Sequence, residues 1–157
     1  MTLAENSTTA PFIQPMKSYS YPATIKKLRD GTYDVQFVDF KEAFTYGETL
    51  DEARNNASEV LSGVLESLIA HNQPIPAPSK KKGATPILPD AKTQAAMAIC
   101  QSLKSSKDVK SMAELARAMN TSWAAASRLG DPSHWPTLKL LDKAVRATGK
   151  RLVISVE

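Results

Sequence analysis

Apolar and polar residues alternate along two stretches near the start of the chain. Residues 21–27 and 33–37 both favour strands, and in the second stretch every other side chain is apolar. A period of two is typical of a strand with one buried face. The pair Asp30-Gly31 between the two stretches is a tight-turn signal. Residues 43–47 are predicted to add a third, short strand.

The period then becomes that of a helix. Apolar side chains recur three or four positions apart at Leu50, Ala53, Ala57, Val60, Leu61, Val64, Leu65 and Leu68. Thr49 and Glu52 have the spacing of a capping box, in which the hydroxyl accepts from the first turn and the carboxylate reaches back. We expect a helix from about Leu50 to His71. Three antiparallel strands under one helix make a small α+β layer.

Prolines cluster in the middle of the chain. Five of the ten prolines fall between residues 74 and 89, around the run Lys80–Lys82. Proline stiffens the backbone and removes a hydrogen-bond donor, so residues 80–90 are predicted to form a linker, with residues 85–88 as a candidate strand. Residues 1–18 are polar and without a period, which predicts a disordered tail.

The second half has the pattern of several short helices. The predicted helices span 91–103, 112–119, 123–129 and 137–148. Their caps are Asp90, the capping box Ser111–Glu114, Ser122 and, at the last C-terminus, Gly149. A left-handed turn at Asn120 separates the middle two helices, because asparagine tolerates that conformation.

The last residues alternate again. Leu152, Ile154 and Val156 predict a terminal strand that is too short to stand without a partner. It either closes the helical module or pairs with the same strand of a second copy, because a lone edge strand invites pairing.

Two short helices joined by a tight turn inside a basic module favour a helix-turn-helix. The second helix of that motif presents side chains to the DNA major groove. The candidate DNA-contacting residues are Ser122, Trp123, Ala124, Ser127 and Arg128. The alternative is a purely structural helical bundle, in which Trp123 packs against Trp135 or a neighbouring helix instead of DNA.

Charge is divided unevenly between the halves. Residues 1–79 hold six Lys/Arg and ten Asp/Glu, whereas residues 80–157 hold fourteen and six. This indicates two modules with partners of opposite charge, the alternative being solubility charge that is unevenly spread. A length of 157 residues allows one ordinary domain or two small ones. The single Cys100 excludes an internal disulfide, and no apolar run is long enough for a bilayer. We expect a cytoplasmic protein without membrane contact.

The order and spacing of motifs in the first half resemble the HicB family of antitoxins. The matching motifs are Tyr21-Pro22-Ala23-Thr24-Ile25, Asp30-Gly31-x-Tyr33-x-Val35-x-Phe37-x-Asp39, Glu42 to Ala53, and Asn72-x-Pro74-Ile75-Pro76-x-Pro78-Ser79. Lys41-Glu42 departs from the Pro-Gly of many members. Residues 113–129 resemble the lambda-repressor-type helix-turn-helix, with Asn120 at the usual turn glycine and Trp123 at a usual polar base-reader.

The resemblance implies an α+β chain with a partial ribonuclease-H-like domain over 19–79 and an all-α helix-turn-helix domain over 91–157. It also implies that the protein inhibits HicA, a small basic ribonuclease toxin that cleaves mRNA, by binding it and blocking its active site. Repression of its own operon through operator DNA, and self-association into a dimer or higher oligomer, are implied as well. The alternative function is a stand-alone regulator whose first module senses a small ligand.

A ribonuclease-H site needs several clustered carboxylates for two metal ions. The candidates Asp34, Asp39, Glu42 and Glu52 are interpreted as surface, turn and capping residues. We therefore expect no enzyme, no metal and no cofactor. The run Lys80–Lys82 is either solvated linker or a minor-groove arm.

Overall fold

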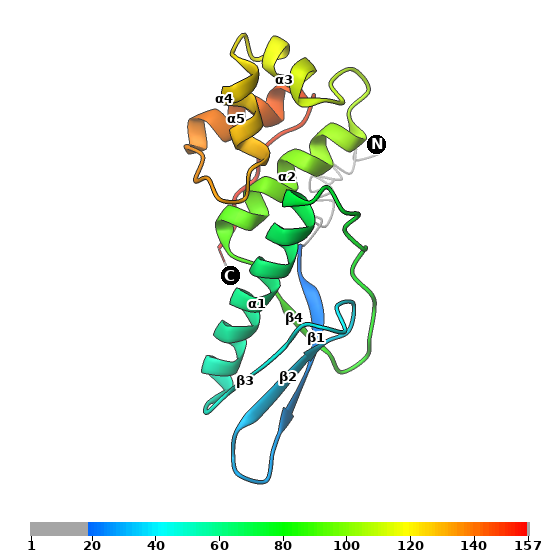
Figure 1. Cartoon of the computed structure of the whole chain (residues 1–157), viewed down its shortest axis with the longest axis vertical. Coiled ribbons are helices and arrows are strands. Elements are labelled where there is room, and N and C mark those ends of the chain that lie inside the picture. The colour runs from blue at the N-terminus through cyan, green and yellow to red at the C-terminus, as the bar shows by residue number, and fades with distance from the viewer. Residues whose placement is uncertain (1–18, 157) are drawn as a thin grey trace, which may run out of the picture.

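Four strands form one antiparallel sheet in the order β3-β2-β1-β4, as seen in a computed structural model that describes residues 19–156 (Figure 1). The predicted tail, residues 1–18, lies outside the described residues. Along the chain, the elements are β1 (Tyr21–Lys27), β2 (Tyr33–Phe37), β3 (Phe44–Gly47), α1 (Leu50–Ala70), β4 (Thr85–Ile87), α2 (Ala91–Ser105), α3 (Met112–Ala118), α4 (Trp123–Ser127), a 3-10 turn (Arg128–Gly130) and α5 (Leu138–Ala147). The chain is therefore α+β, as predicted.

Alternation along β1 and β2 gives the sheet one buried face and one open face. Ala23 and Val35 are completely buried on the face that α1 covers, whereas Thr24 and Asp34 are exposed on the opposite face. The first strand pairs with the second in the register Ala23↔Phe37. The strand assignments made from the period of two are confirmed.

Helix α1 follows the predicted spacing and lies across the sheet (Figure 1). Ala53, Ala57, Leu61 and Leu65 are completely buried and share the core with the sheet. The Thr49 hydroxyl accepts from the backbone N–H of Glu52 at 3.1 Å.

The returning half of this predicted capping box lies one residue earlier than expected. The Glu52 carboxylate accepts from the N–H of Glu48 at 2.8 Å, and not from that of Thr49. The bond to Glu48 still satisfies a backbone N–H donor next to the start of the helix.

The candidate strand at residues 85–88 is present as β4 and completes the sheet. It pairs with β1 through Tyr21↔Ile87, Pro22↔Pro86 and Ala23↔Thr85. Ile87 is 5% exposed and belongs to the core under α1. The sheet thus has four strands, where the sequence predicted three and offered residues 85–88 as a candidate fourth. The division of the chain at residues 80–90 stays a prediction.

Hydrogen bonds hold the proline-rich segment before β4 against the sheet. The hydroxyl of Tyr21 donates to the carbonyl of Pro76 at 2.8 Å. The carboxylate of Asp39 accepts from both the N–H (3.1 Å) and the hydroxyl of Ser79. Burial, followed by the charge of Asp39, raises the pKa of Tyr21 to about 12.

Replacing Tyr21 by phenylalanine is expected to cost about 0.5–1.5 kcal/mol of stability at neutral pH, because the bond to Pro76 is lost. Since an unfolded tyrosine titrates near pH 10, the raised folded pKa contributes stability that is present below about pH 10 and is lost as the pH rises towards 12. The drop in melting temperature between pH 8 and pH 11 should therefore be smaller for Tyr21→Phe than for the parent. Tyr46→Phe, at an exposed hydroxyl, is the control. An equal alkaline loss in all three proteins would contradict this assignment.

Helix α2 takes part in two cores. Met97 packs with the sheet and α1, whereas Ile99 and Leu103 pack with α3 and α5. At its start, Glu66 of α1 bonds the Lys92 ammonium at 3.1 Å and the Thr93 hydroxyl at 3.2 Å. The helix therefore joins the sheet module to the helical module through both apolar and polar contacts.

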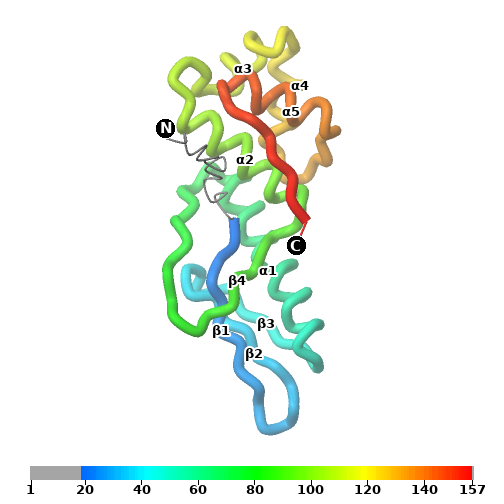
Figure 2. Tube along the Cα trace, turned by 180° about the vertical axis from the view of Figure 1, so that it is seen from behind, coloured from blue at the N-terminus to red at the C-terminus, as the bar shows by residue number. Residues whose placement is uncertain are grey.

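The predicted terminal strand over Leu152–Val156 does not form, so this prediction is wrong for the single chain. Figure 2 shows the segment running back past α2 as an extended trace. Leu152 is half-buried against the second core, but Val153, Ile154 and Val156 are at least 60% exposed. Alternating apolar residues do not form a strand unless a neighbouring strand provides backbone hydrogen bonds. Pairing with a second copy stays a prediction.

Candidate functional site

A tight turn joins α3 to α4. Helix α3 begins at a complete capping box, in which Ser111 Oγ accepts from the N–H of Glu114 at 3.1 Å and the Glu114 carboxylate accepts from that of Ser111 at 3.1 Å. The N–H of Lys110 adds a bond of 2.7 Å to the same carboxylate. These bonds, with that of Lys110 first, hold the pKa of Glu114 below its usual range. Asn120 has a φ of +51°, which confirms the predicted left-handed turn.

Helix α4 is shorter than predicted. Ser122 caps it by accepting from the N–H of Ala125 at 3.1 Å, but the α-helix ends at Ser127 and a 3-10 turn follows to Gly130. Leu129, 2% exposed, anchors this turn in the second core, which tightens the backbone over the last residues.

The helix pair packs closely. Leu115 of α3 is completely buried, and the small Ala116 is only 5% exposed where α4 approaches. The N–H of Thr121 donates to the carbonyl of Ala116 at 2.9 Å, which fixes the turn. The turn therefore holds the two short helices against each other. Their assignment as a DNA-binding helix-turn-helix stays a prediction.

The five candidate DNA-contacting residues lie on or next to α4, and most of them face outwards. Ser122, Trp123, Ala124 and Arg128 are exposed. Ser127 is half-buried, and its hydroxyl donates to the carbonyl of Ala124 at 3.0 Å. Contact of these residues with DNA stays a prediction.

The two tryptophans are both surface residues. Trp123 is 62% exposed and Trp135 is 71% exposed, so neither is buried against a neighbouring helix. Within residues 19–156, the ring contacts join Phe40 to Tyr21 and to Phe37, and none joins the tryptophans. The packing alternative for Trp123 is therefore not the arrangement observed.

Six exposed cations lie on α3, next to α4, in the segment before α3 and on α5. They are Lys107, Lys110, Arg117, Arg128, Lys139 and Lys143. Arg146 instead pairs with Asp142 at 2.8 Å within α5. Of these cations the sequence analysis named only Arg128, because charge composition does not reveal which side chains share a surface. Such side chains can contact phosphates.

The four carboxylates considered for catalysis lie in different settings. Asp34 is exposed on the open sheet face, as its place in the alternation predicted, and Glu42 is exposed in a loop. Asp39 accepts from Ser79, and Glu52 accepts from Glu48. Across residues 19–156 there is no group of three or more His, Cys, Asp or Glu side chains placed to hold a metal ion.

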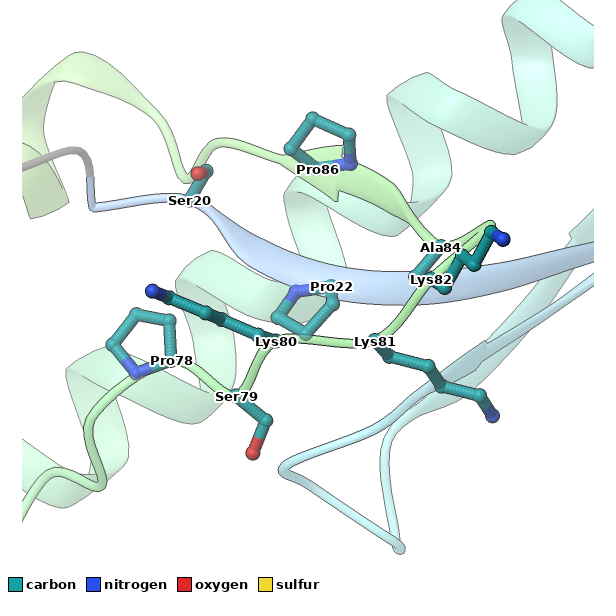
Figure 3. Close-up of a pocket in the computed structure, with 9 residues that line it drawn as sticks. All are labelled: Ser20, Pro22, Pro78, Ser79, Lys80, Lys81, Lys82, Ala84 and Pro86. Atoms are coloured by element: carbon teal, nitrogen blue, oxygen red, sulfur yellow. The ribbon is translucent and has the colours of Figure 1, made fainter.

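Two surface features were not anticipated from the sequence. Phe44 and Tyr46 of β3 are 65% and 66% exposed on the open face of the sheet. A shallow hollow is lined by Lys80, Lys81 and Lys82 together with prolines (Figure 3). Figure 3 shows the three ammonium groups pointing in different directions, so they do not converge on one anion. Contact of these lysines with DNA stays a prediction.

In the part of the chain that the structure describes, the longest helices are too polar or too short to cross a lipid bilayer.

Comparisons with known proteins agree on one family. Residues 20–94 match the family model described as "HicB_like antitoxin of bacterial toxin-antitoxin system". Antitoxin HicB 1 of Photorhabdus laumondii is 28% identical over 142 residues, which cover 90% of this chain and 90% of that protein. Antitoxin HicB of Escherichia coli K12 is 28% identical over 132 residues, or 84% of this chain and 95% of the relative.

Two further matches, one to a protein sequence and one to a solved structure, cover less of this chain. The UPF0150 protein ssr1765 of Synechocystis is 34% identical over 64 residues, which cover 41% of this chain and 81% of that protein. The crystal structure of the N-terminal domain of Burkholderia pseudomallei antitoxin HicB has 23% sequence identity and a TM-score of 0.39, and covers 46% of this chain and 96% of that one. The family model and the antitoxin relatives coincide, and the chain belongs to the HicB-like antitoxin family.

Proposed function

We propose that this protein binds and inhibits a HicA-type mRNA-cleaving toxin and represses its own operon by binding operator DNA. The observation that carries the proposal is the match to Antitoxin HicB 1 over 90% of both chains, because it includes the sheet module and the helical module together. The antitoxin relatives support an antitoxin role that is regulatory and not catalytic. The protein would act in the cytoplasm, where both mRNA and operator lie.

Electrostatics support the assignment of the first module to the toxin. Residues 1–79 carry four more acidic than basic side chains. A basic ribonuclease would be attracted to this surface, and complementary potentials speed association and disfavour wrong partners. Inhibition then requires only that the antitoxin covers the surface with which the nuclease contacts RNA.

The helix pair supports the assignment of the second module to DNA. In this arrangement α3 would lie against the DNA backbone while the exposed Trp123, Ala124 and Arg128 of the following turn reach the major groove. The surrounding lysines and arginines would contact phosphates, which makes affinity fall as salt rises. A two-fold dimer would place two such helices one DNA turn, about 34 Å, apart.

The antitoxin proposal is tested by co-expressing the full chain with the product of the adjacent reading frame. We expect the two proteins to copurify and the full chain to restore growth that the neighbouring protein arrests. The parent chain alone should retard its own promoter fragment at low ionic strength. Copurification of a bound metabolite, with no toxin binding and no rescue, would favour the stand-alone regulator instead.

Replacing Arg128 by alanine is expected to weaken operator binding by about 1–3 kcal/mol, because an exposed arginine beside the second helix can pair with a base edge. Electrophoretic retardation at matched salt measures the change. Arg54→Ala, at an exposed arginine of α1 in the other module, is the matched control and should bind DNA like the parent. Identical footprints for Arg128→Ala and the parent would remove this residue from the interface.

A further inference from the structure

The open face of the sheet carries an aromatic pair on its edge strand. Phe44 and Tyr46 of β3 are 65% and 66% exposed, and they alternate with the half-buried Thr45 and the buried Gly47, which face α1. In the register with β2, Phe44 lies opposite Gln36 and Tyr46 lies opposite Asp34. Two large aromatic side chains that share one exposed face form an apolar patch, which is a mark of an interaction site.

The backbone beneath this pair is held in place from two sides. The side-chain amide of Asn56 in α1 donates to the carbonyl of Tyr46 at 2.9 Å. The side-chain amide of Gln36 donates to the carbonyl of Ala43 at 3.1 Å, just before Phe44. A partner that binds here would spend little free energy on ordering the strand, because its geometry is already set.

Acidic side chains surround the aromatic pair. Three exposed carboxylates and two exposed lysines lie next to it in the register or the sequence: Lys26 of β1 is paired with Asp34, and Lys41 precedes Glu42, so the carboxylates are in excess by one. Asp34 lies next to Tyr46 across the strands, and Glu42 and Glu48 stand two positions before Phe44 and two positions after Tyr46. All three carboxylates are exposed. The surface thus combines an apolar centre with a rim of net negative charge, and both features favour a cationic protein partner.

We propose that Phe44 and Tyr46, with the rim of Asp34, Glu42 and Glu48, form the docking surface for a basic protein. This step depends on the proposed function, which identifies that basic protein as the toxin. The aromatic side chains enter the partner's surface as anchors, and the carboxylates draw lysine and arginine side chains to the rim. Hereafter this set of five residues is called the β3 surface.

The charge of the β3 surface decides between this partner and two others. Aromatic side chains on a sheet can also stack RNA bases, but three nearby carboxylates repel a polyanion. A second copy that met this surface about a two-fold axis would bring like charges together, which is unfavourable. A cationic protein can bury the aromatic side chains and pair its basic side chains with the carboxylates of the rim.

The test is to measure the affinity of the full-length double variant Phe44→Ser/Tyr46→Ser for the purified product of the adjacent reading frame. We expect the dissociation constant to rise at least about thirtyfold, the effect of losing aromatic anchors. Operator retardation and the melting temperature should remain those of the parent, since both side chains are mostly exposed. Trp135→Ser, which removes an aromatic side chain with 71% exposure from the other module, is the matched control and should leave toxin affinity unchanged.

The rim is tested separately with Glu42→Lys/Glu48→Lys. We expect toxin association at low ionic strength to slow by about tenfold, and the difference from the parent to shrink as salt is added. A rate that is independent of these charges would overturn the part assigned to the rim.

Other outcomes separate this inference from the function on which it depends. If the parent binds the toxin and the serine variant binds it equally well, the β3 surface is not the docking site, while the proposed function stands. If the parent itself does not bind the toxin, the proposed function fails and takes the inference with it. Loss of oligouridine binding or of self-association in the serine variant, with toxin affinity intact, would assign the surface to RNA or to a second copy and overturn the proposal.

Discussion

Replacing Gly47 by alanine should destabilise the sheet module by about 3 kcal/mol or more. A Cβ at this position would lie 2.7 Å from Cα of Ala53 and 2.9 Å from the carbonyl carbon of Glu52. Both are backbone atoms of α1, and a helix backbone cannot turn aside as a flexible side chain does. The substitution must therefore push β3 and α1 apart.

The cost is large because several contacts depend on that close approach. Ala53 is completely buried beneath the strand, and Asn56 bonds the carbonyl of Tyr46 only while the helix lies against it. Natural domains are stable by about 5–15 kcal/mol, so a loss of this size removes a large part of the total. Urea unfolding followed by circular dichroism measures the change in the free energy of unfolding.

Gly63→Ala is the matched control for this prediction. Gly63 lies in α1, is exposed, and has no atom within 4 Å of the position a Cβ would take. Alanine there should stabilise the helix by about 0.5–1 kcal/mol, since glycine loses more backbone entropy on folding. The same substitution is thus expected to have opposite signs at two positions. Changes in stability of equal size and sign for the two substitutions would show that β3 and α1 do not contact each other at Gly47.

Local patterns allowed most of the elements of this fold to be predicted. The predicted caps at Thr49, Asp90, Ser111 and Ser122 each accept a hydrogen bond from a backbone N–H three residues later. Such bonds depend only on neighbours in the sequence, so the residue types are sufficient to indicate them. The two short helices α3 and α4 followed from the same kind of signal, as did the left-handed turn at Asn120 between them.

Long-range pairing was harder to predict. Pro86 argues against a strand, yet β4 tolerates it on the edge of the sheet opposite Pro22. Met97 and Ile99 are two residues apart on α2 but belong to different cores, and a helical period cannot show which neighbour each meets. The terminal segment has a strand's alternation and no ladder, because pairing depends on what lies beside it.

One of the two candidate sites could be predicted from the sequence and the other could not. Exposure at α4 was predictable, since the capping residue sets where the helix begins and hence which residues follow on its surface. Exposure of Phe44 and Tyr46 was not, because it depends on α1 covering only one face of the sheet. An exposed aromatic pair and a buried one have the same sequence pattern.

Truncation after Ser79 is expected to abolish cooperative folding of the sheet module. The cut removes β4, and with it Ile87 (5% exposed) and Met97 (1% exposed) from the first core. Each such side chain contributes about 1.5–3 kcal/mol when buried, so their joint loss approaches the whole stability of a small domain. The carbonyl of Leu88, which accepts from the Ser58 hydroxyl at 2.7 Å, is lost as well.

A longer fragment that ends at Ser105 is the control, because it keeps β4 and α2. It exposes Ile99 and Leu103, so both are replaced by lysine to keep the fragment from aggregating. We expect this fragment to unfold cooperatively in urea and to bind the toxin without retarding operator DNA, whereas residues 1–79 show no cooperative transition. Cooperative unfolding of the shorter fragment, at a similar midpoint, would mean that the sheet module does not need β4. Residues 80–90 would then act as a linker, as the sequence predicted. The opposite result would make β4 a structural strand on which toxin binding depends.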